Sequence, residues 1–368
     1  MMKKSLLSVV GIFCVGMMSL FPMEAAQAKG EVITLTLANF FPATAQQSII
    51  FEGFVKDLET QTNGRITVKY LTGGSLLTGP GMFKGIETGI ADMGYSHVFY
   101  TPGRMPVTEF AALPFGYQSA WVSSRVLNDF YRKVKPKEWD SVKVLFFNGS
   151  PPCPLLSTKP VEKLEDLKGL TIRAPGQIGE IVSALGATPS PTPMAETYEA
   201  ISKGVSQGAY LAIEGLKTWR LADVCKYLTN SWQVGNTFPC YLVMNKNSYN
   251  KIPADLKKIF DKLVGEYAER VALMWNDIDI VGMNYGVENG VRFIELSDQE
   301  ALRWKEAVKP LVDTWVKRMV EKGYPESEVK EWISFLKERI EFYGKKQIAL
   351  KIPSVTGPAA MRPENIKK

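Results

Sequence analysis

Alternating strand and helix patterns in the first third of the chain constrain the fold more than any other feature. Residues 34–38 alternate as a strand does, and apolar side chains over 50–58 recur at the three-and-four spacing of one buried helical face. Residues 66–70 fit a second strand, 82–88 a short helix and 91–99 a further strand. This order is typical of an α/β sheet whose strands are joined by right-handed crossovers.

A second α/β unit follows a stiff connection. Residues 142–147 fit a strand, and the Gly- and Pro-rich residues 149–154 mark a place where the chain can pass to another lobe. Strand and helix patterns return over 170–204, and 238–244 is a long apolar strand that can lead back to the first lobe. Because single hydrophobic cores stop growing at roughly 250–300 residues and this chain has 368, we expect two lobes joined by a hinge.

The last third of the chain is expected to be helical. An apolar stripe from Pro253 to about Tyr285 predicts one helix of about 45 Å, long enough to brace both lobes. Ser297 and Glu300 form a capping-box pattern that starts a helix running to about Glu321. One more helical stripe follows, and the proline-containing end of the chain after Lys351 is expected to be extended or disordered.

The N-terminus has the pattern of a signal peptide. Two lysines precede a largely apolar run over 6–21, and Ala-Gln-Ala at 26–28 supplies the small residues that signal peptidase accepts. We expect cleavage after Ala28. The apolar run is short for the roughly 20 residues that span a bilayer, so a retained membrane anchor is the weaker alternative. The mature protein is therefore expected to be free in the periplasm or outside the cell.

These patterns divide the chain into four parts. They are a signal peptide at 1–28, lobe 1 at 29–150 plus about 237–276, lobe 2 with the C-terminal helices at 151–236 plus about 277–345, and an extended tail at 346–368. Outside the signal peptide the cysteines are Cys153, Cys225 and Cys240. Either one disulfide with one free thiol or three free thiols is compatible with this number in an exported protein.

The composition favours binding over catalysis. At 45% hydrophobic and 22% charged residues the chain is typical of a water-soluble globular protein, and a net charge of +6 without a basic block speaks against nucleic acid as a partner. His97 is the only histidine, which excludes a multi-histidine zinc site and leaves a single candidate base for a catalytic triad. Residues 79–85 are one residue out of register with a dinucleotide fingerprint. We expect no enzyme, no metal and no cofactor.

Arg173 is the clearest candidate for a binding residue. It lies at the end of the predicted strand over 170–173, directly before a Pro-Gly turn and a helix. This place is the carboxyl edge of a sheet, where the ligand crevices of α/β proteins form. A guanidinium there can hold a carboxylate through two parallel charge-assisted hydrogen bonds. A structural salt bridge to a nearby acid is the alternative.

Short segments along the chain carry a family resemblance through their order and spacing. They are Thr62-Asn63-Gly64-Arg65, Gly85-Ile86-Glu87-Thr88-Gly89-Ile90-Ala91-Asp92-Met93, Leu113-Pro114-Phe115, Leu167 to Pro175, and Leu185-Gly186-Ala187 followed by Pro193 to Tyr198. Together these segments resemble the extracytoplasmic solute-binding proteins of TRAP transporters, in the branch that binds C4-dicarboxylates and sialic acid. The resemblance covers nearly the whole mature chain.

The resemblance implies a flytrap: two α/β lobes, joined by strands and a long helix, that close over an organic acid. It implies that Arg173 binds the carboxylate of the ligand. It also implies a partner, a two-part membrane permease that draws on an ion gradient, so that no nucleotide is needed. A homodimer is compatible with it.

The chain departs from the family pattern at positions that face the substrate in sialic-acid binders. The second substrate arginine is replaced by Cys153, the stacking aromatic residue by Met194 and an amide-bearing residue by Leu211. These exchanges favour a smaller or more apolar monocarboxylate. Four residues of lobe 1 align with segments that line the cleft in relatives: Asn39, Tyr95, Ser96 and His97.

Two residues of lobe 2, Tyr210 and Glu214, lie near a segment that helps to hold a cation in the keto-acid binders of the family. The signature of that cation site is not reproduced in this chain.

The sequence therefore predicts a periplasmic solute-binding protein that delivers an organic acid to a TRAP-type secondary transporter. Two alternatives use the same cleft. One is a protein that presents its ligand to a membrane sensor, and the other is an exported lyase or hydrolase that processes a carboxylate.

Overall fold

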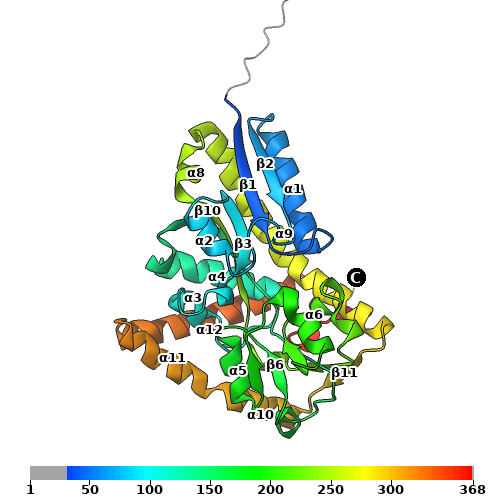
Figure 1. The fold of residues 1–368 in the computed structure, drawn as a ribbon. Helices are drawn as coiled ribbons and strands as arrows, with labels where there is room; N and C mark the ends of the chain where they lie inside the picture. Colours follow the sequence, from blue (N-terminus) through cyan, green and yellow to red (C-terminus); the bar gives the residue numbers. More distant parts are fainter. Residues whose placement is uncertain (1–30, 367–368) are drawn as a thin grey trace, which may run out of the picture. The chain divides into compact units, whose positions relative to one another are not determined.

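The computed structural model describes residues 31–366, so the predicted signal peptide at 1–28 lies outside the described residues. Two β-sheets, one in each lobe, carry the fold, which confirms the predicted α/β class (Figure 1).

The sheet of lobe 1 has five strands in the order β2-β1-β3-β10-β4. Strand β1 pairs in parallel with β2 and β3, whereas β10 runs antiparallel to β3 and β4. The strands are β1 (Ile33–Asn39), β2 (Ile66–Leu71), β3 (Met93–His97), β4 (Val142–Gly149) and β10 (Pro239–Asn245). Because β10 lies between β3 and β4, the chain returns to this sheet after it has built the strands β5 (Leu155–Ser157) to β9 (Tyr227–Asn230) of the other sheet.

The sheet of lobe 2 has six strands in the order β11-β9-β5-β8-β6-β7. Strand β6 pairs in parallel with β7 and β8, and β5 runs antiparallel to β8 and β9. The strands are β5 (Leu155–Ser157), β6 (Thr171–Arg173), β7 (Thr188–Ser190), β8 (Gly208–Tyr210), β9 (Tyr227–Asn230) and β11 (Arg292–Glu295).

Helices connect and cover these strands. The first six are α1 (Gln46–Gln61), α2 (Met82–Glu87), α3 (Pro106–Ala111), α4 (Ala120–Val134), α5 (Ile178–Ala184) and α6 (Met194–Ser202). The others are α7 (Gly215–Thr218), α8 (Lys246–Lys251), α9 (Ala254–Glu288), α10 (Asp298–Val308), α11 (Pro310–Glu321) and α12 (Glu326–Ala349). A short 3-10 helix, η1 (Val98–Tyr100), extends β3.

Helix α9 is the long brace that the apolar stripe predicted. Its 35 residues correspond to about 52 Å, three residues beyond the expected end. Near its start, Phe260 packs edge-on against Phe54 of α1 with ring centroids 6.2 Å apart. Farther along, Gly282 lets the helix approach the second lobe so closely that a Cβ there would lie 2.7 Å from the Cα of Glu214. One rigid helix thus contacts both lobes.

The helix expected from Ser297 to about Glu321 is divided in two. Ser297 does cap α10, since its Oγ accepts a hydrogen bond of 3.2 Å from the backbone N–H of Glu300. Pro310 separates α10 from α11, because proline has no N–H and its ring clashes with the preceding turn of a helix. The proline is visible in the sequence, and the prediction overlooked it.

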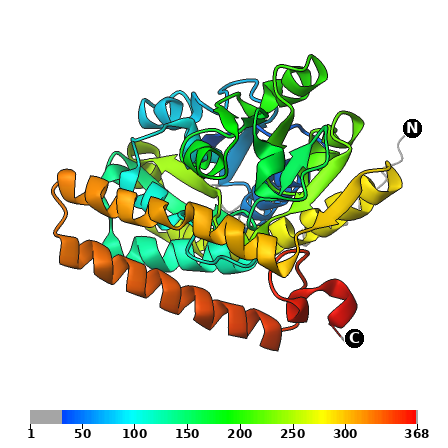
Figure 2. The ribbon, with the colours of Figure 1, turned by 90° about the horizontal axis from the view of Figure 1, so that it is seen from below.

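Helix α12 departs from its expected assignment to lobe 2. It packs on α4 of lobe 1, where the rings of Phe130 and Trp332 meet edge to face and the Tyr343 hydroxyl donates to Asp129 over 2.9 Å. Figure 2 shows it running beside α11. Helix α12 continues to Ala349, within the first residues assigned to the tail, and Met361 beyond it is fully buried.

Two further findings bear on the expectations from sequence. None of the described helices combines the length and the apolar character needed to cross a membrane. Cys153, Cys225 and Cys240 are buried free thiols, so the alternative of three thiols holds for this structure.

Candidate functional site

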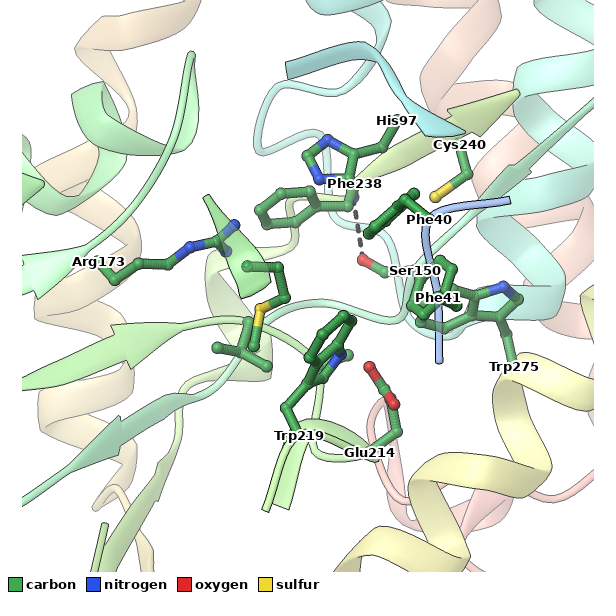
Figure 3. Close-up of a pocket in the computed structure, with 13 residues that line it drawn as sticks. Phe40, Phe41, His97, Ser150, Arg173, Glu214, Trp219, Phe238, Cys240 and Trp275 are labelled. Carbon is green, nitrogen blue, oxygen red and sulfur yellow. Dashed lines mark hydrogen bonds between the residues drawn. The ribbon is translucent and has the colours of Figure 1, made fainter. Parts of the chain in front are cut away.

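A small cavity of about 50 Å³ lies where the two lobes meet (Figure 3). Its lining is mostly apolar and aromatic, with a few polar groups. Lobe 1 with its connections and α9 supplies Phe40, Phe41, His97, Ser150, Phe238, Cys240 and Trp275; lobe 2 supplies Arg173, Met194, Leu211, Ala212, Glu214 and Trp219.

The strand ends explain why these side chains converge. Phe40 directly follows β1 and His97 ends β3, and these strands are parallel neighbours in lobe 1. Arg173 ends β6 and Leu211 follows β8, which are parallel neighbours in lobe 2. The carboxyl ends of the parallel strands in both lobes therefore meet at the cavity, as is usual for ligand crevices in α/β folds.

Arg173 is a buried cation without an ion pair. Its side chain is only 2% exposed, and its Nε donates to the backbone carbonyl of Thr192 over 3.0 Å. Its Nη2 has no hydrogen-bond partner. Among the salt bridges of the described residues none involves Arg173, so the alternative of a structural salt bridge does not hold. Burial lowers the pKa of the guanidinium, yet arginine keeps its charge in proteins.

His97 lies beside Arg173 and is neutral. Burial lowers its pKa well below 6.5, and the charge of Arg173 lowers it further. The imidazole stacks on Tyr100, with ring centroids 3.7 Å apart, and its Nδ1 has no partner. The cavity therefore has two nitrogen atoms, on Arg173 and on His97, whose hydrogen-bonding capacity is unused.

Tyr100 links the lobes. Its hydroxyl accepts a hydrogen bond of 3.1 Å from the backbone N–H of Met194, the first residue of α6 in lobe 2. Gln177 of lobe 2 donates to the carbonyl of Glu109 in lobe 1 over 2.8 Å. Gly176 lies so close to Phe99 that a Cβ would be 2.9 Å from the Cβ of that residue. The lobes are thus in direct contact around the cavity.

Aromatic rings form the walls. Trp219 of lobe 2 stacks on Phe40 of lobe 1 with centroids 6.5 Å apart, and it lies 5.8 Å from Phe41. Trp275 of α9 lies edge-on to Phe41, and its Nε1 donates to the hydroxyl of Tyr95 over 3.1 Å. Such walls suit the apolar body of a ligand.

Glu214 provides an acidic group in the same cavity. It is 4% exposed, and its Oε2 has no hydrogen-bond partner. Its backbone N–H donates to Asp279 of α9 over 2.8 Å. Burial raises the pKa of Glu214 from 4.5 to about 7. Three or more His, Cys, Asp or Glu side chains do not gather anywhere in the described part of the chain in a way that would hold a metal ion.

Half of the residues selected from sequence line the cavity. They are His97, Arg173, Met194, Leu211 and Glu214. The other five are held in hydrogen bonds or packing around it: Asn39 with Tyr70, Tyr95 with Asn148, Ser96 with the carbonyl of Gly79, Tyr210 with Ser231, and Cys153, whose Sγ faces Ser150 and the carbonyl of Pro151.

Sequence reasoning missed most of the walls. The missed residues are Phe40, Phe41, Ser150, Ala212, Trp219, Phe238, Cys240 and Trp275. The first two could have been found, because they follow a predicted strand at its carboxyl end. Nothing in the sequence places Trp275 there, because its position depends on how α9 packs across the lobes.

Two α/β lobes that meet at a cavity with an unpaired buried arginine define a bilobal ligand-binding protein. The chain belongs to the bacterial extracellular solute-binding proteins of family 7, whose model matches residues 37–318.

Solved structures of solute binding proteins are similar to this chain in fold. A TRAP periplasmic solute binding protein from Desulfovibrio salexigens has a TM-score of 0.73 and 33% identity, with coverage of 85% of this chain and 97% of that one. A TRAP solute binding protein from Rhodoferax ferrireducens, in complex with copurified benzoate, has a TM-score of 0.80, 23% identity and coverage of 86% and 99%, and supports the fold.

One curated relative is similar over a shorter stretch. The monocarboxylate 2-oxoacid-binding periplasmic protein of Nostoc sp. is 25% identical over 245 residues, which are 64% of this chain and 66% of that protein. The resemblance found in the sequence, to solute-binding proteins of TRAP transporters, is thereby confirmed.

Proposed function

We propose that this protein binds an organic acid in the periplasm and delivers it to a TRAP-type permease. One observation carries the proposal: Arg173 is buried, unpaired and directed into a cavity that both lobes line. A buried cation is costly unless it gains a partner, and the carboxylate of a ligand is the natural one. His97 is the second donor candidate for the same carboxylate.

The lining supports a monocarboxylate with an apolar body. Arg173 is the only Lys or Arg among the lining residues, so the cavity offers one cationic site. Around it stand aromatic rings together with Met194 and Leu211. The benzoate bound by the Rhodoferax protein is an acid of this kind.

Closure of the two lobes is the proposed means by which the protein captures its ligand and presents it to the permease. The two lobes touch through Tyr100 and Met194 next to the cavity. A cavity of about 50 Å³ is too small for an organic acid to enter while these contacts hold, so entry requires the lobes to part. A ligand that contacts both lobes then favours the closed state, whose surface the permease recognises.

The proposed partner is the pair of permease subunits in the membrane, and the protein is not expected to alter its ligand. A sensor in place of the permease would use the same closed state. A lyase or hydrolase would not return its ligand intact, so mass spectrometry of the acid after long incubation with pure protein separates transport from catalysis. Light scattering after size-exclusion chromatography tests for the homodimer.

A thermal-shift screen of C3 to C8 monocarboxylic, dicarboxylic, keto and aromatic acids tests the proposed function. We expect at least one acid to raise the melting temperature of the wild type and not that of Arg173→Met. If no acid does so, or if the variant responds equally, the proposed function is wrong.

A further inference from the structure

We propose that Glu214 forms a second polar end of the ligand site and accepts a hydrogen bond from a hydroxyl or amino group of the bound acid. This inference rests on the proposed function and narrows the ligand to a monocarboxylate with a hydrogen-bond donor away from its carboxylate. Figure 3 shows Arg173 and Glu214 pointing into the cavity from different sides, with Trp219 beside Glu214.

The position of Glu214 is fixed from two directions. It precedes α7, and its backbone N–H donates to Asp279 Oδ1 over 2.8 Å. The missing side chain of Gly282 lets α9 contact the backbone at Glu214. The same helix carries Trp275, which lines the cavity. Because the backbone of Glu214 is held in this way and its Oε2 has no partner, the side chain is preorganised to accept a hydrogen bond from a ligand.

The surrounding protein does not neutralise Glu214. The described salt bridges do not include it, and the side chain that accepts from its backbone N–H is another acid, Asp279, whose Oδ2 is also buried without a partner. Thr218 of α7 and Gln47 of α1 lower the pKa of Glu214, but burial outweighs them. Lys217, Arg270 and Asp277 share with Glu214 a separate outer pocket of about 730 Å³.

This arrangement disfavours a dicarboxylate. A second carboxylate would face Glu214, and like charges in a site of low polarity destabilise each other unless a proton is taken up. A hydroxyl or amino group instead satisfies Oε2, and a site built for a donor strongly rejects the analogue that lacks it. Glu214 therefore acts as a residue that determines specificity.

The experiment compares two matched sets of acids by calorimetry at pH 7.5. The first set is benzoate, 3-hydroxybenzoate and isophthalate; the second is butyrate, 4-hydroxybutyrate and glutarate. Within each set only the distal group changes, from hydrogen to hydroxyl to carboxylate. We expect the hydroxyl member of at least one set to bind the wild type at least tenfold more tightly than both others.

Two variants and one control identify the residue responsible. Glu214→Leu removes the acceptor and should abolish the advantage of the hydroxyl. Glu214→Gln keeps an acceptor without the negative charge and should bring the affinity for the dicarboxylate within threefold of that for the hydroxyl acid. Glu109→Gln changes another buried acid, outside the cavity lining, and should leave the wild-type order intact.

The order in which the wild type binds the six acids, from tightest to weakest, tests the inference even if a variant does not fold. The inference is overturned if the dicarboxylate binds as tightly as the hydroxyl acid, or if the hydroxyl acid binds no more tightly than the acid without a distal group. It is also overturned if none of the six acids binds. An affinity that disappears with a chelator and returns with Ca²⁺ overturns it as well, because Glu214 would then hold a cation. If another acid still stabilises the protein through Arg173, the proposed function stands and only this inference fails.

Discussion

Replacing Arg173 by Met should separate the binding role of this residue from any structural role. Methionine has a similar length and no charge. In the liganded protein the change removes a buried charge-assisted contact, which typically costs about 2–5 kcal/mol of binding free energy. At about 1.4 kcal/mol per factor of ten, Kd for the cognate acid should rise roughly 30- to 4,000-fold.

The free energy of unfolding without ligand should respond differently. The variant loses the hydrogen bond of 3.0 Å from Arg173 Nε to the Thr192 carbonyl, worth about 1 kcal/mol. It also removes the unpartnered Nη2, and a buried unsatisfied donor costs roughly 1–3 kcal/mol. The two effects together predict unchanged stability or a gain of up to about 2 kcal/mol.

Urea denaturation without ligand and calorimetry with the acid measure the two quantities. Arg318→Met is the control, because Arg318 is 41% exposed and pairs with Glu180 over 2.7 Å outside the cavity. The control should bind like the wild type. A loss of about 2 kcal/mol or more in the unliganded Arg173→Met protein, together with a Kd within threefold of wild type, would refute the reasoning.

Three further predictions concern the surroundings of the cavity. Burial raises the pKa of Glu109 from 4.5 to about 7, so between these pH values the folded protein keeps a proton that the unfolded chain releases. The free energy of unfolding should therefore fall by up to about 3 kcal/mol as pH rises from 4.5 to 7. In urea denaturation Glu109→Gln should become more stable relative to the wild type at pH 8 but not at pH 5. Tyr100→Phe keeps the ring against His97 but loses the acceptor for the Met194 N–H, so Kd should rise about fivefold and small-angle scattering should show less compaction with ligand; unchanged values would remove this bond from closure. In a background with Cys153 and Cys225 replaced by Ala, a disulfide reagent should modify the buried Cys240 only when the lobes part, and bound acid should slow the reaction at least tenfold; equal rates would mean that Cys240 is reached without opening.

The sequence was sufficient for the framework and for the charged end of the site. Arg173 could be placed because the end of a strand and a following Pro-Gly turn are local patterns that define the carboxyl edge of a sheet. The long helix could be predicted because an apolar stripe is local as well. Trp275 and Phe238 could not, since each reaches the cavity only after the chain has passed through the other lobe and returned.

Tyr95 and Asn39 show a second limit. Both align with cleft-lining segments, yet the Tyr95 hydroxyl donates to Asn148 and receives the Nε1–H of Trp275, while Asn39 bonds Tyr70. Each therefore supports a residue or segment next to the cavity instead of facing it. Sequence alignment identifies the segment, but the direction of a side chain depends on partners that are distant along the chain.

The unpartnered atoms on Arg173 and Glu214 explain why closure should depend on the ligand. Closing the lobes takes both groups away from water, and each buried polar atom left without a partner costs roughly 1–3 kcal/mol, so the closed state without ligand is disfavoured by roughly 2–6 kcal/mol relative to a fully satisfied one. A ligand shifts the equilibrium only by its differential affinity for the two states. An acid with a carboxylate alone satisfies Arg173, whereas an acid that also carries a donor satisfies Glu214 too. The second kind should therefore bind more tightly and also compact the protein more completely, and scattering at saturating concentrations of benzoate and 3-hydroxybenzoate should rank the two in that order. Equal compaction would show that the Arg173 contact alone is enough to close the lobes.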